Sequence, residues 1–384
     1  MARYTLFIFL TFLSTTQISC KPYKSHKKEV FERDMRLTAE QQDALFSSKK
    51  NIKRNVILDQ YLWPSTTKDG QHIVEVPYQF ASNVKSSVKD TFKKVVNAFN
   101  RLSCIRLVPR KGDEDCLLIE SENTDCDSWV GHVGGEQPVN LGYGCQTVGH
   151  GIHEVLHAVG FYHEQSRPDR DDFVKIYWEN IQEGFEDEFR KYSSNEGRTG
   201  SALRKIPYDT HSIMHYINTA FSKNGGRTIE DIQDPSENVG QLHFFSANDL
   251  FKLNTVYDCS EDYRHAKTYK IIVETSNDWW SGTDARVFVE VFKIQSGART
   301  DSGEIELKEG QFESGDVDVE MLLLPDLTPI GEIIVWHSNE GMGASWKLYK
   351  VVIEDTKTHQ RYTFIYDGWF EGDASENRKI LKPN

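Results

Sequence analysis

Hydrophobic residues recur at helical spacing in three stretches of the first two thirds of the chain. Each stretch predicts an amphipathic helix whose apolar side packs in a core. The run from Cys104 to Val108 has the pattern of a buried strand that packs with the first helix. The three apolar sets are Val84, Val88, Phe92, Val95, Val96 and Phe99; then Val148, Ile152, Val155, Leu156 and Val159; and then Trp178, Ile181, Phe185 and Phe189.

The pattern changes after Cys259, where short β-rich runs follow one another between turn residues. Together they predict an all-β sandwich. Ser260 to Ala266 is polar and charged, as expected of a linker between two domains. The predicted strands are Lys270 to Thr275, Arg286 to Phe292, Glu332 to Trp336, Trp346 to Glu354 and Arg361 to Tyr366.

The N-terminal 54 residues are expected to lie outside both domains. Arg3 and the short apolar run Tyr4 to Leu13 indicate a secretory signal over residues 1–20, so we expect a secreted, extracellular protein. Residues 21–54 are basic and end in the pair Lys53-Arg54, which indicates a removable leader that is cut between Arg54 and Asn55. The chain has a formal net charge of −13, of which residues 55–384 carry −19 because the first 54 residues are net positive. Such an acidic body argues against nucleic acid as a partner.

The chemistry of the chain is concentrated in residues 153–163. His153 and His157 are four residues apart, so on a helix both imidazoles point to one side and can bind one zinc ion. Gly160 allows a sharp turn that brings His163 back as a third ligand. Three histidines leave a fourth position open for water, as in a catalytic rather than a structural zinc site. Glu154 lies beside the metal and can act as the general base.

An alternative ligand set uses His150, which is three residues before His153 on the same side of the helix. Three ligands on one straight helix fit a tetrahedral ion poorly, so we favour His163 over His150.

The six cysteines, at positions 20, 104, 116, 126, 145 and 259, have no C-x-x-C spacing. In a secreted chain they are expected to form disulfides, and loss of Cys20 with the signal would leave an odd number. Their spacing alone does not select the pairing.

The run from His163 to Asp171, with Glu164 directly after the third histidine, resembles the astacin family of zinc endopeptidases. Ser212-Ile213-Met214-His215-Tyr216 is similar to the Met-turn of that family, and the likeness extends over about residues 55–260. The resemblance implies a two-lobed metzincin-type fold with zinc bound by His153, His157 and His163. It also implies Glu154 as the base, Tyr216 as an additional ligand that can leave the metal and bind the oxyanion, and Met214 beneath the site.

The leader also resembles that of astacin precursors. Their Phe-x-Gly-Asp motif corresponds here to Phe31-Glu32-Arg33-Asp34, with Arg33 in place of glycine. The resemblance implies that Asp34 occupies the open zinc position before activation. Cutting after Arg54 would then free the amino group of Asn55 to pair near Glu164.

Family pairing further implies disulfides between Cys104 and Cys259 and between Cys126 and Cys145. Cys116 then remains as a buried free thiol in a strand.

The second domain, about residues 267–382, resembles a PLAT domain, a β-sandwich that often holds an enzyme against a membrane or a protein partner. Trp279 and Trp280 are candidates for insertion into lipid, and Trp336, Trp346 and Trp369 are expected in the core. The loop acids Asp278, Asp284 and Asp316 could bind calcium. The matching residues are Gly282 to Ala285, Gly315-Asp316, Ile334 to His337, Asn339, Gly341, Trp346 and Asp367 to Trp369.

We therefore predict an α+β zinc protease domain followed by an all-β sandwich. The expected function is a secreted, proenzyme-activated zinc endopeptidase that acts on proteins or peptides and is localised by its sandwich. One alternative is a binding protein with a vestigial protease domain, against which the intact ligands and base argue. The other is a different metzincin protease, against which Glu164 and Tyr216 argue.

Overall fold

The computed structural model describes residues 30–31, 34–46, 59–68, 71–122, 126–192, 206–295, 298–307, 311–339, 345–370 and 377–384. The predicted signal and the predicted cleavage site at Arg54 and Asn55 lie outside these residues. Within this part of the chain, no helix is both long and apolar enough to cross a membrane.

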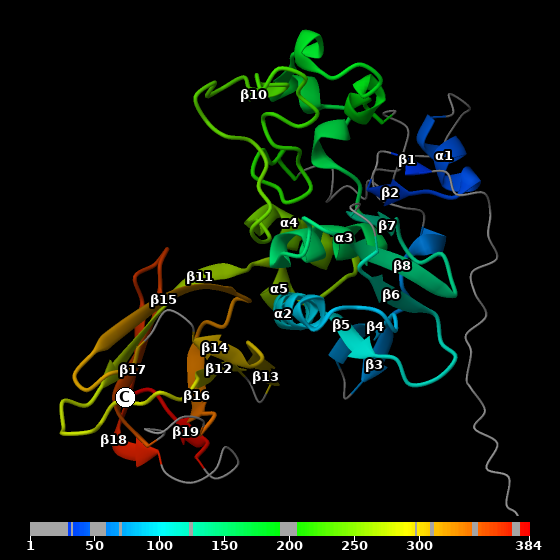
Figure 1. Cartoon of the computed structure of the whole chain (residues 1–384). Coiled ribbons are helices and arrows are strands. Elements are labelled where there is room, and N and C mark those ends of the chain that lie inside the picture. The colour runs from blue at the N-terminus through cyan, green and yellow to red at the C-terminus, as the bar shows by residue number, and fades with distance from the viewer. Residues whose placement is uncertain are drawn as a thin grey trace, which may run out of the picture.

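The first lobe is built on one twisted sheet (Figure 1). Its strands follow the order β1-β2-β7-β8-β6-β4-β3, and β5 pairs with β4. Strands β1 and β2 come from the predicted leader, with β1 at the edge of the sheet and β2 parallel to β7. The strands are β1 (Val30–Phe31), β2 (Met35–Arg36), β3 (Thr66–Lys68), β4 (Gln71–Phe80), β5 (Ile105–Pro109), β6 (Cys116–Glu120), β7 (Cys126–Trp129) and β8 (Glu136–Leu141).

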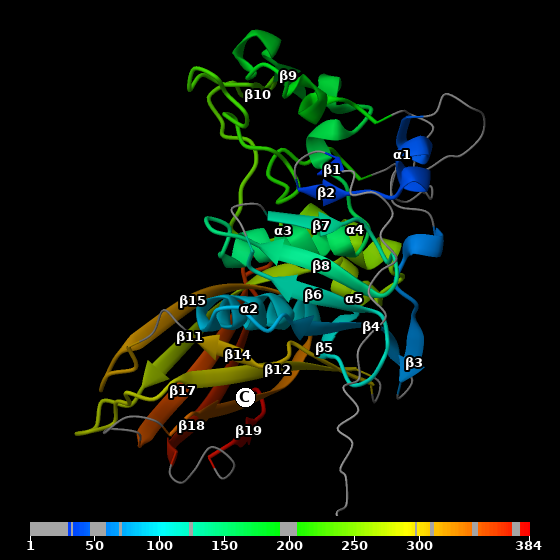
Figure 2. The ribbon, with the colours of Figure 1, turned by 45° about the vertical axis from the view of Figure 1, so that its right-hand side comes forward.

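Two helices pack on this sheet, and both were predicted from their apolar spacing. Helix α2 (Ser86–Leu102) buries Val88, Phe92 and Phe99 against the sheet, and β5 follows it as predicted. Helix α3 (Val148–Ala158) is capped at its N-terminus by Thr147, whose side chain accepts a hydrogen bond from the backbone N–H of His150. The helices contact each other, and their apolar sides form one core with the sheet. Figure 2 shows α3 beside β7 and β8 and α2 beside β5.

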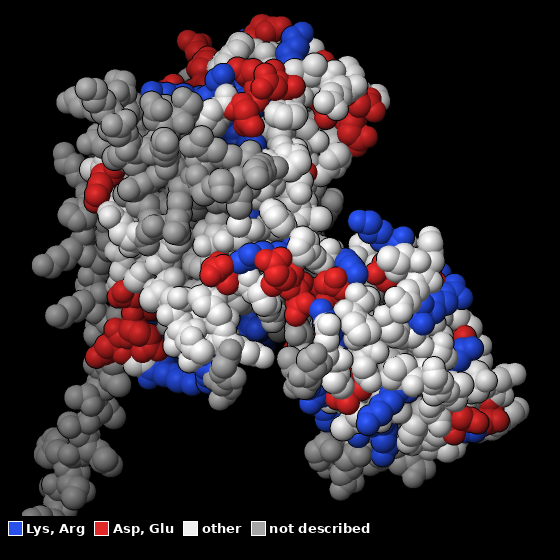
Figure 3. All heavy atoms as spheres, turned by 180° about the vertical axis from the view of Figure 1, so that it is seen from behind, with Lys and Arg blue, Asp and Glu red and all other residues white. Residues whose placement is uncertain are grey.

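The described part of the second lobe, residues 164–192 and 206–245, contains mainly short helical turns around a small separate core. That core includes Val174, Ile181 and Phe189. The lobe has the short strands β9 (Val174–Ile176) and β10 (Ile229–Asp231). On the face in Figure 3, acidic side chains gather at its outer end.

The predicted helix over Trp178 to Phe189 is wrong. The structure has two separate 3-10 turns there, Trp178–Asn180 and Glu186–Phe189. Gly184 lies between them with φ 85°, which a helix does not allow, and the backbone N–H of Gln182 donates to Phe221 O at 2.9 Å. The apolar spacing reflects burial in the small core and not a continuous helix.

Helix α4 (Ala247–Val256) returns the chain to the first lobe, and the short helix α5 (Glu261–Arg264) leads to the second domain. Asn254 of α4 is buried and donates to Leu102 O and to Tyr263 O, each at 2.9 Å. Asp262 of α5 contacts the second domain, because its carboxylate pairs with Lys293 at 2.6 Å and its backbone oxygen accepts from Asp326 N at 2.8 Å. The segment expected as a linker is thus hydrogen-bonded to the protease domain on one side and hydrogen-bonded and ion-paired to the second domain on the other.

The C-terminal domain is a sandwich of two antiparallel sheets, in the orders β15-β11-β17-β18 and β13-β12-β16-β19, with β14 on β12. Alternate residues such as Tyr269, Ile271 and Val273 point into its core. The strands are β11 (Lys267–Thr275), β12 (Val287–Gln295), β13 (Ala298–Asp301), β14 (Ile305–Leu307), β15 (Val317–Leu324), β16 (Ile330–His337), β17 (Trp346–Asp355), β18 (Arg361–Phe370) and β19 (Lys379–Leu381).

The predicted tryptophan positions are partly right. Trp346 and Trp336 are buried, as expected. Trp369 is 38% exposed because side chains alternate along β18: Phe364 and Phe370 point into the core, and Trp369 points to the outer face, so its assignment to the core is wrong. Trp279 and Trp280, in the turn between β11 and β12, are 83% and 79% exposed.

Candidate metal centre

Helix α3 and the turn after it bring three histidines together between the two lobes. His153 and His157 lie one helical turn apart on α3. Gly160 ends the helix with φ 101°, and the chain turns back so that His163 faces both of them. The Nε2 atoms of His157 and His163 lie 3.1 Å and 3.3 Å from Nε2 of His153.

The hydrogen bonds on the far side of two rings define which nitrogen carries the proton. His153 Nδ1 lies 2.8 Å from Ile213 O, and His157 Nδ1 lies 2.7 Å from Phe161 O. Because a carbonyl oxygen only accepts, each Nδ1 must be the donor, and each Nε2 presents a lone pair. Lone pairs this close repel each other unless a cation lies between them. The donor set therefore fits a zinc ion, for which oriented imidazole nitrogens are typical ligands.

A carboxylate from the predicted leader completes the cluster. Asp34 Oδ2 lies 3.1 Å from His163 Nε2 and 3.4 Å from His153 Nε2. Burial alone would raise the pKa of Asp34, but the electrostatic effect of His163 and the close contacts with the His153 and His163 rings hold it well below its usual range. These four residues are the one group of three or more possible metal ligands found in the described part of the chain.

Glu154 lies next to the cluster and is almost fully buried. Its Oε2 atom has no hydrogen-bond partner among the described residues. Burial raises its pKa well above the usual value, and the nearby carboxylates of Asp34 and Asp127 raise it further. A buried carboxylate with an unused oxygen beside a metal-binding cluster is placed to accept a proton.

His150 does not join the cluster, although it is on the same helix. Its Nδ1 lies 2.8 Å from the hydroxyl of Thr147, at the start of α3. The structure brings His163, and not His150, to His153 and His157.

The predicted Met-turn lies beneath the histidines and is held by α4. Asp249 accepts hydrogen bonds from the Ser212 hydroxyl at 2.5 Å and from Ile213 N at 2.9 Å. This fixes the Ile213 carbonyl that orients His153. Met214 is buried, and its carbonyl accepts from Glu164 N at 2.8 Å.

Tyr216 lies against the third histidine. The centres of its ring and of the His163 ring are 4.8 Å apart. Its hydroxyl donates to Glu188 Oε2 at 3.3 Å, a contact that the sequence did not suggest. Tyr216 is thus beside the cluster, and Asp34 contacts two of the histidines.

The leader is joined to the cleft by backbone and side-chain bonds. Ser128 N donates to Asp34 O at 2.8 Å, and Val130 N donates to Arg36 O at 3.1 Å. The guanidinium of Arg36 pairs with the carboxylate of Asp127, and both side chains are buried. Sequence reasoning missed Arg36 and Asp127. The available signal was only that Arg36 lies two residues after Asp34, close to the expected latency ligand.

Glu164, the expected partner of the Asn55 amino group, has other partners in this structure. Its carboxylate contacts Lys252 Nζ at 2.6 Å, Arg167 Nη1 at 3.0 Å and the backbone N–H of Asp209 at 3.1 Å. Burial would raise the pKa of Glu164, but Lys252 and Arg167 lower it below the usual value.

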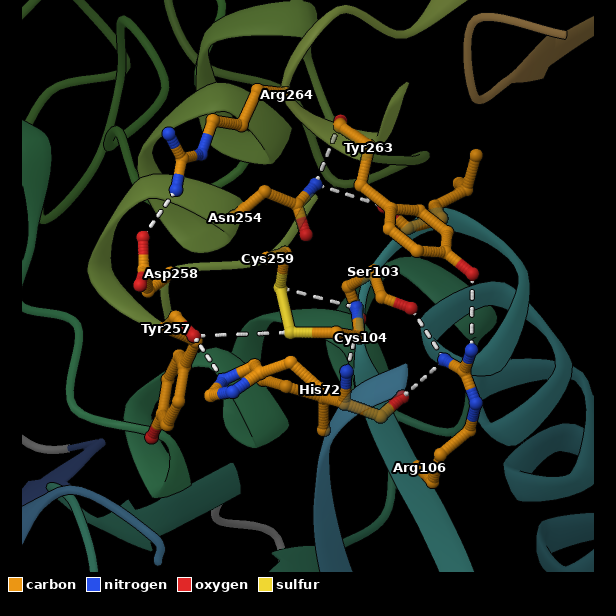
Figure 4. Close-up of a disulfide and its surroundings, with 12 residues drawn as sticks. His72, Ser103, Cys104, Arg106, Asn254, Tyr257, Asp258, Cys259, Tyr263 and Arg264 are labelled. Carbon is orange, nitrogen blue, oxygen red and sulfur yellow. Dashed lines mark hydrogen bonds and ion pairs between the residues drawn. A yellow bond between two sulfur atoms is a disulfide. The ribbon is translucent and has the colours of Figure 1, made fainter. Parts of the chain in front are cut away.

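Two disulfides connect parts of the protease region. Cys104 is bonded to Cys259, which ties the start of β5 to the end of α4 (Figure 4). His72 and Arg106 surround this bond and hydrogen-bond to nearby carbonyls. Cys126 is bonded to Cys145, and Cys116 is buried outside both disulfides.

Comparison with known proteins gives two family matches. The Astacin peptidase family matches residues 65–258, and the PLAT/LH2 domain matches residues 269–381. The chain is 41% identical over 211 residues to zinc metalloproteinase nas-13 of Caenorhabditis elegans, covering 54% of this chain and 44% of that protein. It is 38% identical over 211 residues to zinc metalloproteinase nas-4 of the same organism, covering 54% of this chain and 63% of that protein.

A solved structure is also similar. High choriolytic enzyme 1, a hatching-enzyme zinc protease from Oryzias latipes, has 34% identity and a TM-score of 0.47, covering 52% of this chain and 96% of that one.

The match to nas-13 and nas-4 spans about half of the length of those two proteins. The first domain match covers half of the present chain and includes the three histidines, Glu154 and the Met-turn. The chain belongs to the astacin family of peptidases and carries a C-terminal PLAT domain.

Proposed function

We propose that this chain is the precursor of a secreted zinc endopeptidase that is held inactive by its own leader. The observation that carries the proposal is the convergence of three histidine Nε2 atoms beside the unused oxygen of Glu154. His153, His157 and His163 would hold the zinc. When bound, zinc would act as a Lewis acid that polarises the scissile carbonyl and lowers the pKa of water.

The protein's own residues would then move the protons. Glu154 accepts a proton from the attacking water and later donates it to the leaving amine. Its position favours this exchange, because the carboxylate is buried beside the histidines and has an oxygen with no hydrogen-bond partner among the described residues. Tyr216 leaves Glu188 and donates a hydrogen bond to the oxyanion, a contribution of about 3 kcal/mol to barrier lowering.

Latency would come from the leader. Asp34 contacts the histidines at the place that the metal requires, and β2 covers the free edge of β7. A substrate peptide needs the same edge to add as a strand, so the leader and the substrate exclude each other. Cutting after Arg54 would allow the leader to depart, and the new amino group of Asn55 would pair with Glu164 after displacing its present cations.

A direct test uses the precursor before and after cutting at Arg54. We expect the cut, oxidised protein to contain one zinc per chain and to hydrolyse a generic protein in a chelator-sensitive way. The uncut precursor should hydrolyse it far more slowly. Cut protein without stoichiometric zinc would exclude the metal site, and equal rates before and after cutting would exclude latency.

The PLAT domain would place the enzyme at a lipid surface. Trp279 and Trp280 protrude side by side, with ring centres 6.2 Å apart. Indole rings favour the membrane interface, so a pair at the tip of a domain can insert without unfolding it. Replacing both residues with Ser should abolish sedimentation with phosphatidylcholine vesicles, whereas Trp178→Ser, at an exposed position in the protease region, should not. Unchanged vesicle binding by the double variant would exclude this tryptophan pair as the membrane contact, and a parent protein that does not sediment with vesicles would favour a protein partner.

Calcium binding by the sandwich stays a prediction. Asp278 is paired with Lys347, and Asp284 and Asp316 do not gather with other acids into a group of three within the described residues. Calorimetric titration of the zinc-loaded protein with calcium would test it, and a lack of heat would remove calcium from the proposal.

A further inference from the structure

We propose that Asp127 forms an anionic subsite in the cleft that receives a lysine or arginine side chain of the bound substrate. This inference rests on the proposed peptidase function and adds a substrate preference to it. The leader strand β2 shows how an extended peptide can occupy this part of the cleft.

The subsite lies on the strand that the leader covers. Strand β7 pairs with β8 on one side and with β2 on the other. Once β2 has gone, the backbone groups of Ser128 and Val130 that now bind Asp34 and Arg36 become free. A substrate that adds to this edge would use the same groups.

The carboxylate of Asp127 is oriented by the protein itself. Asn140 of β8, directly opposite in the sheet, donates from Nδ2 to Asp127 Oδ1 at 3.2 Å. The other oxygen, Oδ2, faces the guanidinium of Arg36. The leader therefore contributes the cation, while the body of the protein contributes both the anion and the group that positions it.

In the closed precursor this carboxylate is paired with a cation. The side chains of Arg36 and Asp127 are 10% and 7% exposed. Among the described residues, Arg36 is the one cationic group paired with Asp127. Departure of the leader leaves a carboxylate in the cleft with no positive partner, and a substrate lysine or arginine can replace it.

The spacing between Arg36 and Asp34 indicates how far along a bound peptide the subsite lies from the metal centre. Arg36 follows Asp34 by two residues, Asp34 directly precedes β2, and Asp34 contacts the histidines. Asp127 therefore selects the side chain about two positions from the residue that lies at the metal centre. The experiment determines on which side of the scissile bond this position falls.

The test compares matched peptides on the activated enzyme. A quenched fluorescent peptide set carries lysine or its uncharged analogue norleucine at each position within three residues of the scissile bond. We expect the wild-type enzyme to prefer lysine at one position by at least about tenfold in kcat/KM. In Asp127→Asn this ratio should fall towards one, and in Asp127→Glu it should persist. Asp90→Asn, which removes an exposed charge from α2, is the matched control and should keep the ratio.

A second measurement requires no variant of the enzyme. A synthetic peptide of residues 30–38 should inhibit the activated wild-type enzyme, and replacing Arg36 by uncharged citrulline should weaken inhibition by at least about tenfold. Equal inhibition by the two peptides, or a lysine preference that survives in Asp127→Asn, would overturn the subsite. Zinc-loaded wild-type enzyme that cleaves the set with no charge preference would also overturn it but leave the peptidase proposal intact. Failure to cleave any peptide would instead overturn the peptidase proposal.

Discussion

Replacing Arg36 with alanine should partly activate the uncut precursor. Arg36 pairs with Asp127 in a contact that is nearly closed to solvent. In the variant, the closed leader would cover the Asp127 carboxylate without giving it a cation. In the open state the same carboxylate meets water, so the substitution disfavours the closed state alone.

The expected magnitude follows from the burial of the pair. Removing one partner of a buried ion pair costs about 3 to 5 kcal/mol. We take about 3 kcal/mol, because the pair lies at the edge of the cleft where water can enter after truncation. Since about 1.4 kcal/mol corresponds to a factor of ten, the open population should rise roughly 150-fold.

The assay needs a precursor that cannot be cut, so every variant also carries Arg54→Gln. Residual hydrolysis of a fluorogenic peptide reports the open population. Hydrogen exchange at the backbone N–H groups of Ser128 and Val130, which donate to Asp34 O and Arg36 O, reports it without reference to activity. Both readouts should increase in Arg36→Ala.

A double variant tests the cause. Adding Asp127→Asn to Arg36→Ala removes the unpaired charge, so most of the closed-state stability should return, and exchange at the two N–H groups should slow again. If Arg36→Ala is no more active than its parent and exchanges no faster, the ion pair does not hold the leader in place. If the double variant opens as readily as the single one, charge burial is not the cause.

Three further outcomes are expected. Glu154→Gln in the cut protein should keep one zinc per chain by metal analysis but lose about 10²- to 10⁴-fold in hydrolysis, because an amide cannot accept the proton; ordinary turnover would remove Glu154 from the mechanism. Burial lowers the pKa of His337, so the folded state keeps this ring neutral. Its contribution to the free energy of unfolding is fully present above the ordinary histidine pKa and is lost as the pH falls below that value. Urea unfolding at several pH values should show this loss in the parent protein and less of it in His337→Gln. Replacing Cys104 and Cys259 together with serine should lower the free energy of unfolding by about 5 kcal/mol, since the bond closes a loop with a sequence separation of 155; a change below about 1 kcal/mol in urea melts would contradict that account.

The histidine cluster could be predicted because its chemistry is local in sequence. Two ligands one helical turn apart, a glycine and a third histidine all occur within eleven residues, so helical geometry nearly determines the site. Helix α2 was predicted for the same reason, since its apolar spacing continues over four turns. The fold class followed from local patterns together with the family resemblance.

Features that depend on long-range pairing could not be predicted in this way. Asp127 has a role only because a strand 91 residues earlier in the chain lies beside it. The segment from Trp178 to Phe189 has helical spacing, but its backbone donors bind another segment and Gly184 turns the chain. Trp369 looks like a core residue, but the register of β18 turns its side chain to the outer face of the sheet, next to the buried Phe370.

The bonded connection between the domains affects how the enzyme meets large substrates. Asp262 holds the sandwich through Lys293 and Asp326, Asn254 anchors α5 to the protease domain, and Leu323 of β15 packs against the protease core. Two domains joined in this way move as one unit and do not reorient independently. The surface that the sandwich binds therefore sets both the distance and the orientation of the cleft relative to that surface. Attachment alone can then decide which peptide bonds of a large, immobile substrate reach the cleft.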